Sequence, residues 1–117
     1  MFELSPQGDH LWKEKVLHTF DGGDGVAPQA SLIFDTEGNL YGTTLGATVG
    51  GTGHAGTVFK LTPASDGPWK ETVMHYFRPA HYFSPISKLS FDAAGNLYGT
   101  VTYGGSHHLG TVFEIEP

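Results

Sequence analysis

The sequence repeats itself, and the repeat limits the folds available to it more than any other feature. WKEKVLHTF at 12–20 returns 57 residues later as WKETVMHYF at 69–77. FDTEGNLYGTT at 34–44 returns in the same register as FDAAGNLYGTV at 91–101. A repeat of this length is typical of propellers and solenoids, in which each unit covers the core of its neighbour.

A third motif extends the repeat to both ends of the chain. GTVFKLTP at 56–63 returns as GTVFEIEP at 110–117, and a partial copy, FELSP, begins at residue 2. We therefore interpret residues 1–117 as a single repeat domain. Its parts are a partial unit (1–20), a repeat unit (21–77) and an incomplete unit (78–117) that strand 12–20 would close.

The composition indicates an all-β protein. The chain has 17 Gly and 7 Pro among 117 residues, too many for a helical protein. Period-two alternation in both units predicts antiparallel strands joined by hairpins, with tight turns at the GN dipeptides. The glycine of each LYGT motif lies in mid-strand and predicts a closely approaching backbone or a bulge. The predicted strands are 12–20, 31–35, 39–44, 57–62, 69–77, 88–92, 96–101 and 111–115.

These motifs carry a family resemblance. LIFDTEGNLYGTT, the glycine-rich loop, GTVFKLTP and WKETVMHYF together resemble the GloVer tandem repeat of bacterial proteins, over nearly the whole chain. The resemblance implies propeller-like sheets and display outside the cell or at its surface, and it implies no common activity. FDxxGNLY is also similar to NHL-type propeller blades, where the motif spans the innermost strand and the next one out.

We therefore expect an all-β fold with two four-stranded antiparallel propeller blades per chain, in which the strands follow the order of NHL-type blades. Propellers typically contain four to eight blades, so two blades leave apolar faces uncovered. We therefore expect a homo-oligomer that closes a ring. Three chains are the preferred number and two chains are the alternative.

The charge limits the other partners. The formal net charge is −6, with only six Lys and Arg, which argues against a nucleic-acid-binding surface. No apolar run approaches the length of a membrane helix, so no membrane partner is expected. The absence of cysteine excludes a thiolate nucleophile and a cysteine-based zinc site.

The loops at one end of the predicted strands carry most of the chemistry, and they differ most between the units: DGGDGVAP at 21–28 becomes RPAHYFSP at 78–85. Aromatic and polar loops on a rigid scaffold favour a non-enzymatic binding module for a carbohydrate or a protein. No catalytic residue is predicted. The candidate ligand-binding residues are Arg78, His81, Tyr82, Phe83, Tyr103, His107 and His108.

A metal-assisted hydrolase or lyase is the alternative, with its site at the mouth of the propeller channel. His54 and His108 correspond in the two units, each two residues before GT, and with Asp24 they are the candidate ligands of a divalent metal. Turn chemistry explains DGGDG as well as a metal does. His18 and His75 are expected to be packed, hydrogen-bonded residues rather than ligands. A repeat fragment with no role beyond folding is a third option, and no cofactor is required.

Overall fold

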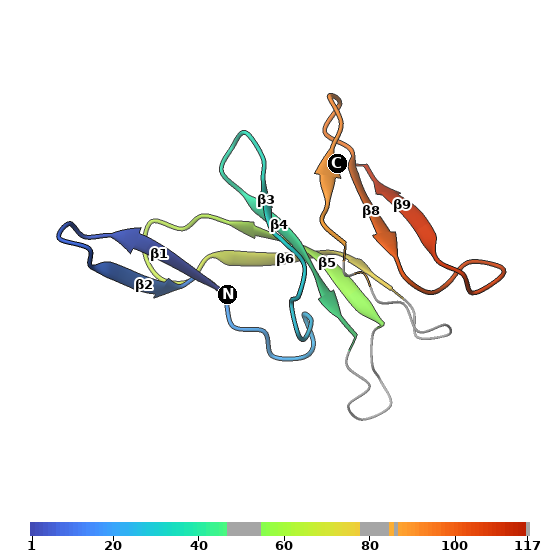
Figure 1. The fold of residues 1–117 in the computed structure, drawn as a ribbon, viewed down its shortest axis with the longest axis horizontal. Helices are drawn as coiled ribbons and strands as arrows, with labels where there is room; N and C mark the ends of the chain where they lie inside the picture. The colour runs from blue at the N-terminus through green and yellow to red at the C-terminus, as the bar shows by residue number, and fades with distance from the viewer. Residues whose placement is uncertain (47–54, 78–84, 86, 117) are drawn as a thin grey trace.

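The computed structural model describes residues 1–46, 55–77, 85 and 87–116, and in these residues it contains nine strands and no helix (Figure 1). The strands are β1 (Phe2–Pro6), β2 (Trp12–Val16), β3 (Ile33–Phe34), β4 (Leu40–Leu45), β5 (Gly56–Thr62), β6 (Lys70–Tyr76), β7 (Ser90–Phe91), β8 (Leu97–Val101) and β9 (Thr111–Ile115). No helix in the described part of the chain is therefore long enough to cross a membrane.

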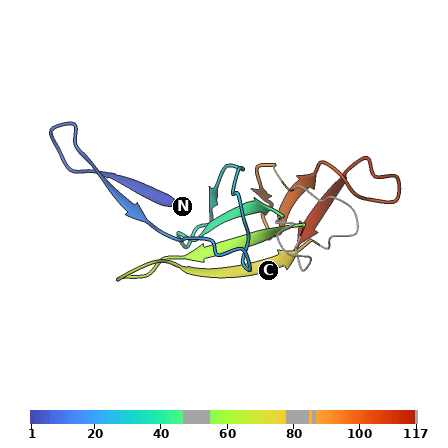
Figure 2. The same ribbon diagram turned by 90° about the horizontal axis from the view of Figure 1, so that it is seen from below.

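The strands form three antiparallel sheets that follow one another along the molecule (Figures 1 and 2). The first contains β1 and β2, the second has the order β3-β4-β5-β6, and the third has the order β7-β8-β9. The all-β class is confirmed. One sheet has the four expected strands, whereas its repeat counterpart has three in the described part of the chain.

The pairing register repeats with the sequence. In the first sheet Phe2 lies opposite Val16 and Leu4 opposite Glu14. The corresponding residues of the second sheet pair in the same way, with Phe59 opposite Val73 and Leu61 opposite Glu71. The β1–β2 sheet is therefore the outer half of the same four-stranded unit.

Three strands, those predicted at 12–20, 31–35 and 88–92, are clearly shorter in the structure than the sequence predicts. The strand predicted at 12–20 ends at Val16. Leu17 N still donates to Met1 O at 2.9 Å, but the carbonyl of Leu17 accepts a hydrogen bond of 2.8 Å from Trp69 N, just before β6. The strand predicted at 31–35 is reduced to Ile33 and Phe34, because Asp35 begins the turn to β4. Its counterpart β7 also has two residues.

The glycine of each LYGT motif faces a side chain, not the backbone or bulge that the sequence predicts. A Cβ atom at Gly42 would lie 2.6 Å from Cζ of Phe59, which is on the neighbouring strand β5. Gly99 and Phe113 are related in the same way. The missing side chain therefore makes room for the aromatic ring of GTVF.

Candidate functional site

The turn between β3 and β4 is organised by one carboxylate, that of Asp35. Its Oδ1 accepts hydrogen bonds from the backbone N of Glu37 at 2.9 Å and of Asn39 at 2.8 Å. Its Oδ2 accepts from Asn39 Nδ2 at 2.7 Å and from the hydroxyl of Tyr41 at 3.0 Å. Gly38, at φ +84°, takes the left-handed conformation that the turn requires. Four donors therefore occupy both oxygens of Asp35.

The turn between β7 and β8 repeats this arrangement around Asp92. The backbone N of Ala94 and of Asn96, the Asn96 amide and the Tyr98 hydroxyl all donate to it, at 2.8–3.2 Å. Burial alone would raise the pKa of Asp35 and of Asp92, but these hydrogen bonds outweigh it and hold both values below the ordinary range. The acid of FDxxGNLY is thus an ionised structural group in both units.

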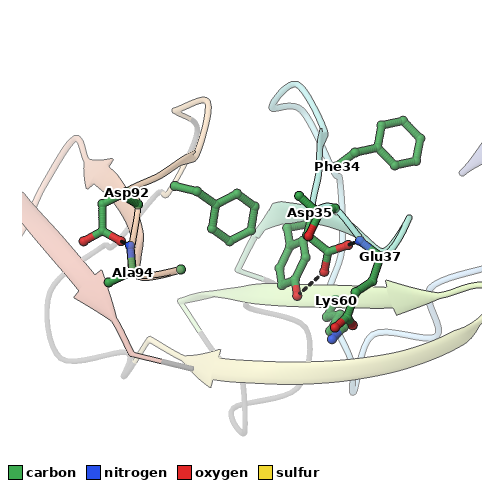
Figure 3. Close-up of a pocket in the computed structure, with 11 residues that line it drawn as sticks. Phe34, Asp35, Glu37, Lys60, Asp92 and Ala94 are labelled. Atoms are coloured by element: carbon green, nitrogen blue, oxygen red, sulfur yellow. Dashed lines mark hydrogen bonds between the residues drawn. The ribbon is translucent and has the colours of Figure 1, made fainter.

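A cavity of about 680 Å³ lies between these two turns (Figure 3). Its lining residues are Phe34, Asp35, Thr36, Glu37, Tyr41, Lys60, Phe91, Asp92, Ala93, Ala94 and Gly95. Both aspartates are engaged in their turns, and Glu37 Oε2 accepts a longer hydrogen bond of 3.3 Å from Asn39 Nδ2. The second carboxylate oxygen of Glu37 and the amine of Lys60 are the charged groups of the lining that can meet a ligand.

The chemistry of the cavity is amphipathic. Lys60 Nζ lies 5.5 Å from the centroid of the Tyr41 ring, and its interaction with the Tyr41 hydroxyl raises the pKa of Lys60. A cation, a carboxylate and aromatic rings suit a polar organic ligand better than an ion. Sequence reasoning missed this cavity, since it treated that end of the strands as short connections only. The matched FDTEG and FDAAG turns are the signal that could have indicated it.

At the other end of the sheets, only part of the predicted ligand-binding set is described. Tyr103, His107 and His108 lie in the loop between β8 and β9, and Tyr103 is exposed. His107 Nδ1 is 2.9 Å from the Ser106 hydroxyl, and His108 has φ +57°. The remaining candidates lie outside the described residues: Arg78, His81, Tyr82, Phe83 and the metal candidate His54.

The candidate metal ligand Asp24 instead joins the DGGDG loop to its surroundings. Its Oδ2 lies 2.7 Å from His18 Nε2, and its backbone carbonyl accepts a hydrogen bond of 3.1 Å from Thr57 Oγ1. The Thr57 hydroxyl is in turn 2.7 Å from that of Thr44. His18 also contacts Phe20 edge to face, which confirms the expectation of a packed, hydrogen-bonded histidine.

No group of three or more His, Asp or Glu side chains suited to a metal ion occurs among the described residues. His108 and Asp24 therefore form no such group with described neighbours. The prediction that includes His54 lies outside what the structure describes.

Comparison with known proteins gives one match. A family model described as the Gloeobacter/Verrucomicrobia repeat matches residues 1–117. Neither the comparison with curated proteins nor that with solved structures gives a match.

Proposed function

This chain belongs to the Gloeobacter/Verrucomicrobia repeat family, and we propose that it is a non-enzymatic binding module built from propeller-type sheets. The repeated motifs hold the scaffold, and the loops that differ between units contact a carbohydrate or protein ligand. The observation that carries this proposal is the hydrogen bonding of the Asp35 and Asp92 carboxylates within their turns. The acid that recurs in each unit has its oxygens occupied by the turn and is not left for chemistry.

The propeller arrangement is supported by strand order. The order β3-β4-β5-β6 follows the chain, as expected of a propeller blade, and successive sheets pack against each other through apolar side chains. Such a scaffold presents the connections between its strands at two ends, where ligands bind without disturbing the core.

The loop between β8 and β9 supports ligand binding at one end. Tyr103 combines an exposed aromatic ring with a hydroxyl, and the neighbouring His107 carries a polar ring. Tyrosine supplies contact area with little loss of side-chain entropy, and its hydroxyl adds a hydrogen bond. This combination suits a sugar ring or a peptide.

The test is binding to immobilised polysaccharides and to a panel of oligosaccharides by calorimetry. We expect Tyr103→Ala and His107→Ala to weaken binding at least several-fold, while the control Asp66→Asn, in the exposed turn between β5 and β6, leaves it unchanged. Loss of binding in Glu37→Gln instead would place the ligand in the cavity between the turns. No binding to any saccharide or cell-envelope protein would contradict the proposal.

The metal-assisted hydrolase or lyase remains the second prediction, and it rests on His54, His108 and Asp24. Elemental analysis of the purified protein separates it from the binding module. A stoichiometric divalent metal that is lost in His108→Ala would favour it.

A further inference from the structure

Two hydrophobic clusters hold the three sheets together. The first joins the β3–β6 sheet to the β7–β9 sheet, and its buried members are Tyr41, Val58, Phe77, Leu89, Leu97 and Val101. The second joins the β1–β2 sheet to the β3–β6 sheet, and its buried members are Leu17, Leu40, Phe59 and Leu61. The counterparts of these four in the next unit are Met74, Leu97, Phe113 and Ile115, all of which belong to the first cluster.

The aromatic contacts show that the two clusters share one geometry. Phe77 meets Phe113 edge to face, with centroids 5.3 Å apart and an interplanar angle of 67°. Phe20 meets Phe59 at 5.2 Å and 68°. The same sheet-to-sheet interface therefore occurs twice in the molecule.

The second interface is incomplete on the side of the inner strands. In the complete one, Tyr41 of β4 meets Phe91 edge to face at 5.1 Å, and Leu89 is 1% exposed. In the described part of the chain the β1–β2 sheet has no inner strands, so nothing plays the part of Tyr41. The counterparts Phe34 and Leu32 are 64% and 36% exposed. Figure 3 shows Phe34 pointing away from the side on which Asp92 lies.

The β7–β9 sheet exposes the missing half of this interface. Val112 of β9 is 75% exposed, whereas its counterpart Val58 is completely buried in the first cluster. Tyr98 of β8 is partly exposed, whereas its counterpart Tyr41 is buried. The β7–β9 sheet thus exposes the counterparts of Tyr41 and Val58 that the β1–β2 sheet lacks.

We propose that a second copy of this chain binds head to tail, with Tyr98 and Val112 of one copy packed against Phe34 and Leu32 of the next. The contact reproduces the interface between Tyr41 and Phe91 that the molecule already contains. The two faces differ from each other, so the interface is heterologous and closes into a ring when the rotation allows. This inference does not depend on the ligand-binding proposal.

Docking in this geometry places β9 of the incoming copy where β1 lies, so β9 replaces β1 beside β2. The charges favour the exchange. β1 places Glu3 opposite Lys15 and Ser5 opposite Lys13. In the register of β5 and β6, β9 places Glu114 opposite Lys15 and Glu116 opposite Lys13, which adds an opposite-charge pair.

The strand that leaves is weakly held. β1 belongs to a two-stranded sheet, a marginal structure in water. Its Phe2 and Leu4 side chains are exposed. After the exchange, every copy contributes its β3–β6 sheet and a composite sheet of β7, β8, β9 and the partner's β2. Three copies give six sheets and two give four. Three are expected, since a four-sheet ring leaves little room for Phe34 and Phe91.

Light scattering coupled to size-exclusion chromatography tests the assembly with the full chain at micromolar concentration. We expect a closed trimer, and a closed dimer would also support the proposal. Phe34→Asp and Val112→Asp should each give a monomer with an unchanged β-sheet circular dichroism spectrum, because both side chains are exposed in the single chain. Leu11→Asp is the control, since Leu11 is exposed in the β1–β2 turn outside both clusters, and it should leave the assembly intact.

Mixing the two monomeric variants gives the sharper result. The Phe34→Asp variant keeps the Val112 face and the Val112→Asp variant keeps the Phe34 face, so their mixture should form a one-to-one dimer that cannot close. A monomeric unchanged chain, or assembly unaffected by both substitutions, would overturn the proposal. So would two monomeric variants that fail to combine.

A charge substitution tests the exchange of strands. Position 13 lies opposite Ser5 in the single chain but opposite Glu116 of the incoming copy. Because like charges opposite each other repel, Lys13→Glu should weaken association roughly two- to five-fold. Glu116→Lys in the same chain should restore it. No effect of either change would overturn the pairing of β9 with β2.

Discussion

The aromatic ring of Phe59 occupies the space beside Gly42, so that a Cβ atom at position 42 would lie 2.6 Å from Cζ of the ring. The same Cβ would lie 2.8 Å from Cδ2 of Leu32, on the other side. Gly99 stands between Phe113 and Leu89 in the same way. The LYGT and GTVF motifs therefore recur together because GTVF supplies the aromatic ring and the glycine of LYGT leaves the space for it.

Substitution Gly42→Ala should lower the free energy of unfolding by about 1–3 kcal/mol, because the added methyl group overpacks the core. Thermal unfolding followed by circular dichroism measures the loss. The double variant Gly42→Ala with Phe59→Leu should lose less than the sum of the two single variants, since the shorter side chain vacates the space. Simple additivity would show that the ring does not limit position 42.

Asp35→Asn should destabilise the protein at neutral pH by about 1 kcal/mol, because the charged acceptor of four hydrogen bonds is lost at a partly exposed position. The folded pKa of Asp35 lies below its unfolded value of 3.8. The contribution of the Asp35 carboxylate to the free energy of unfolding is therefore fully present above pH 3.8 and disappears as the pH falls through the lowered folded pKa. Melting temperatures of both proteins between pH 7 and pH 2 should converge in acid.

Asp92→Asn should also lower the melting temperature at neutral pH and lose this effect in acid, because the four corresponding donors surround Asp92. The matched pair tests whether the motif acts alike in both units. A stability difference for either variant that stays constant down to pH 2 would contradict the assigned role of the carboxylate.

Glu71→Gln should stabilise the protein at neutral pH by up to about 1 kcal/mol. Burial first, and then the charge of Asp24, raise the pKa of Glu71, and its Oε1 is buried without a hydrogen-bond partner among the described residues. A raised folded pKa favours folding below the unfolded value of 4.5 and penalises it once the pH has risen through the folded value. The stabilisation by Glu71→Gln should therefore vanish in acid.

Glu14→Gln is the matched control for Glu71, since Glu14 occupies the same repeat position on β2 but is exposed. Its melting temperature should stay near that of the unchanged protein at every pH. An equal gain in both variants would point to net charge rather than to the burial of Glu71.

Tyr103→Ala and His107→Ala should leave the free energy of unfolding within about 0.5 kcal/mol of the unchanged protein, because both lie in a loop outside the two hydrophobic clusters. Urea unfolding at pH 7 measures this. A larger loss would mean that the loop supports the sheets, and the ligand-binding interpretation would lose its basis.

Much of the fold was predictable because strands and hairpins are local. Alternation located the strands, and GN dipeptides located the turns at Gly38 and Gly95, which both have positive φ. The extent of β3 and β7 was not predictable, because it depends on where Asp35 and Asp92 begin their turns. His18 could be assigned a packed role from its apolar neighbours, but its partner Asp24 could not be named.

The all-β class, the repeat register and the order of strands could be predicted from the sequence, since each depends on the spacing of residues along the chain. Which residues of equivalent strands are covered could be read only from the packing of the sheets. Val58 and Val112 have the same neighbours in sequence, yet one is buried and the other is 75% exposed. Burial depends on the sheet that packs opposite a residue, and the local sequence around the two valines does not record whether that sheet is present.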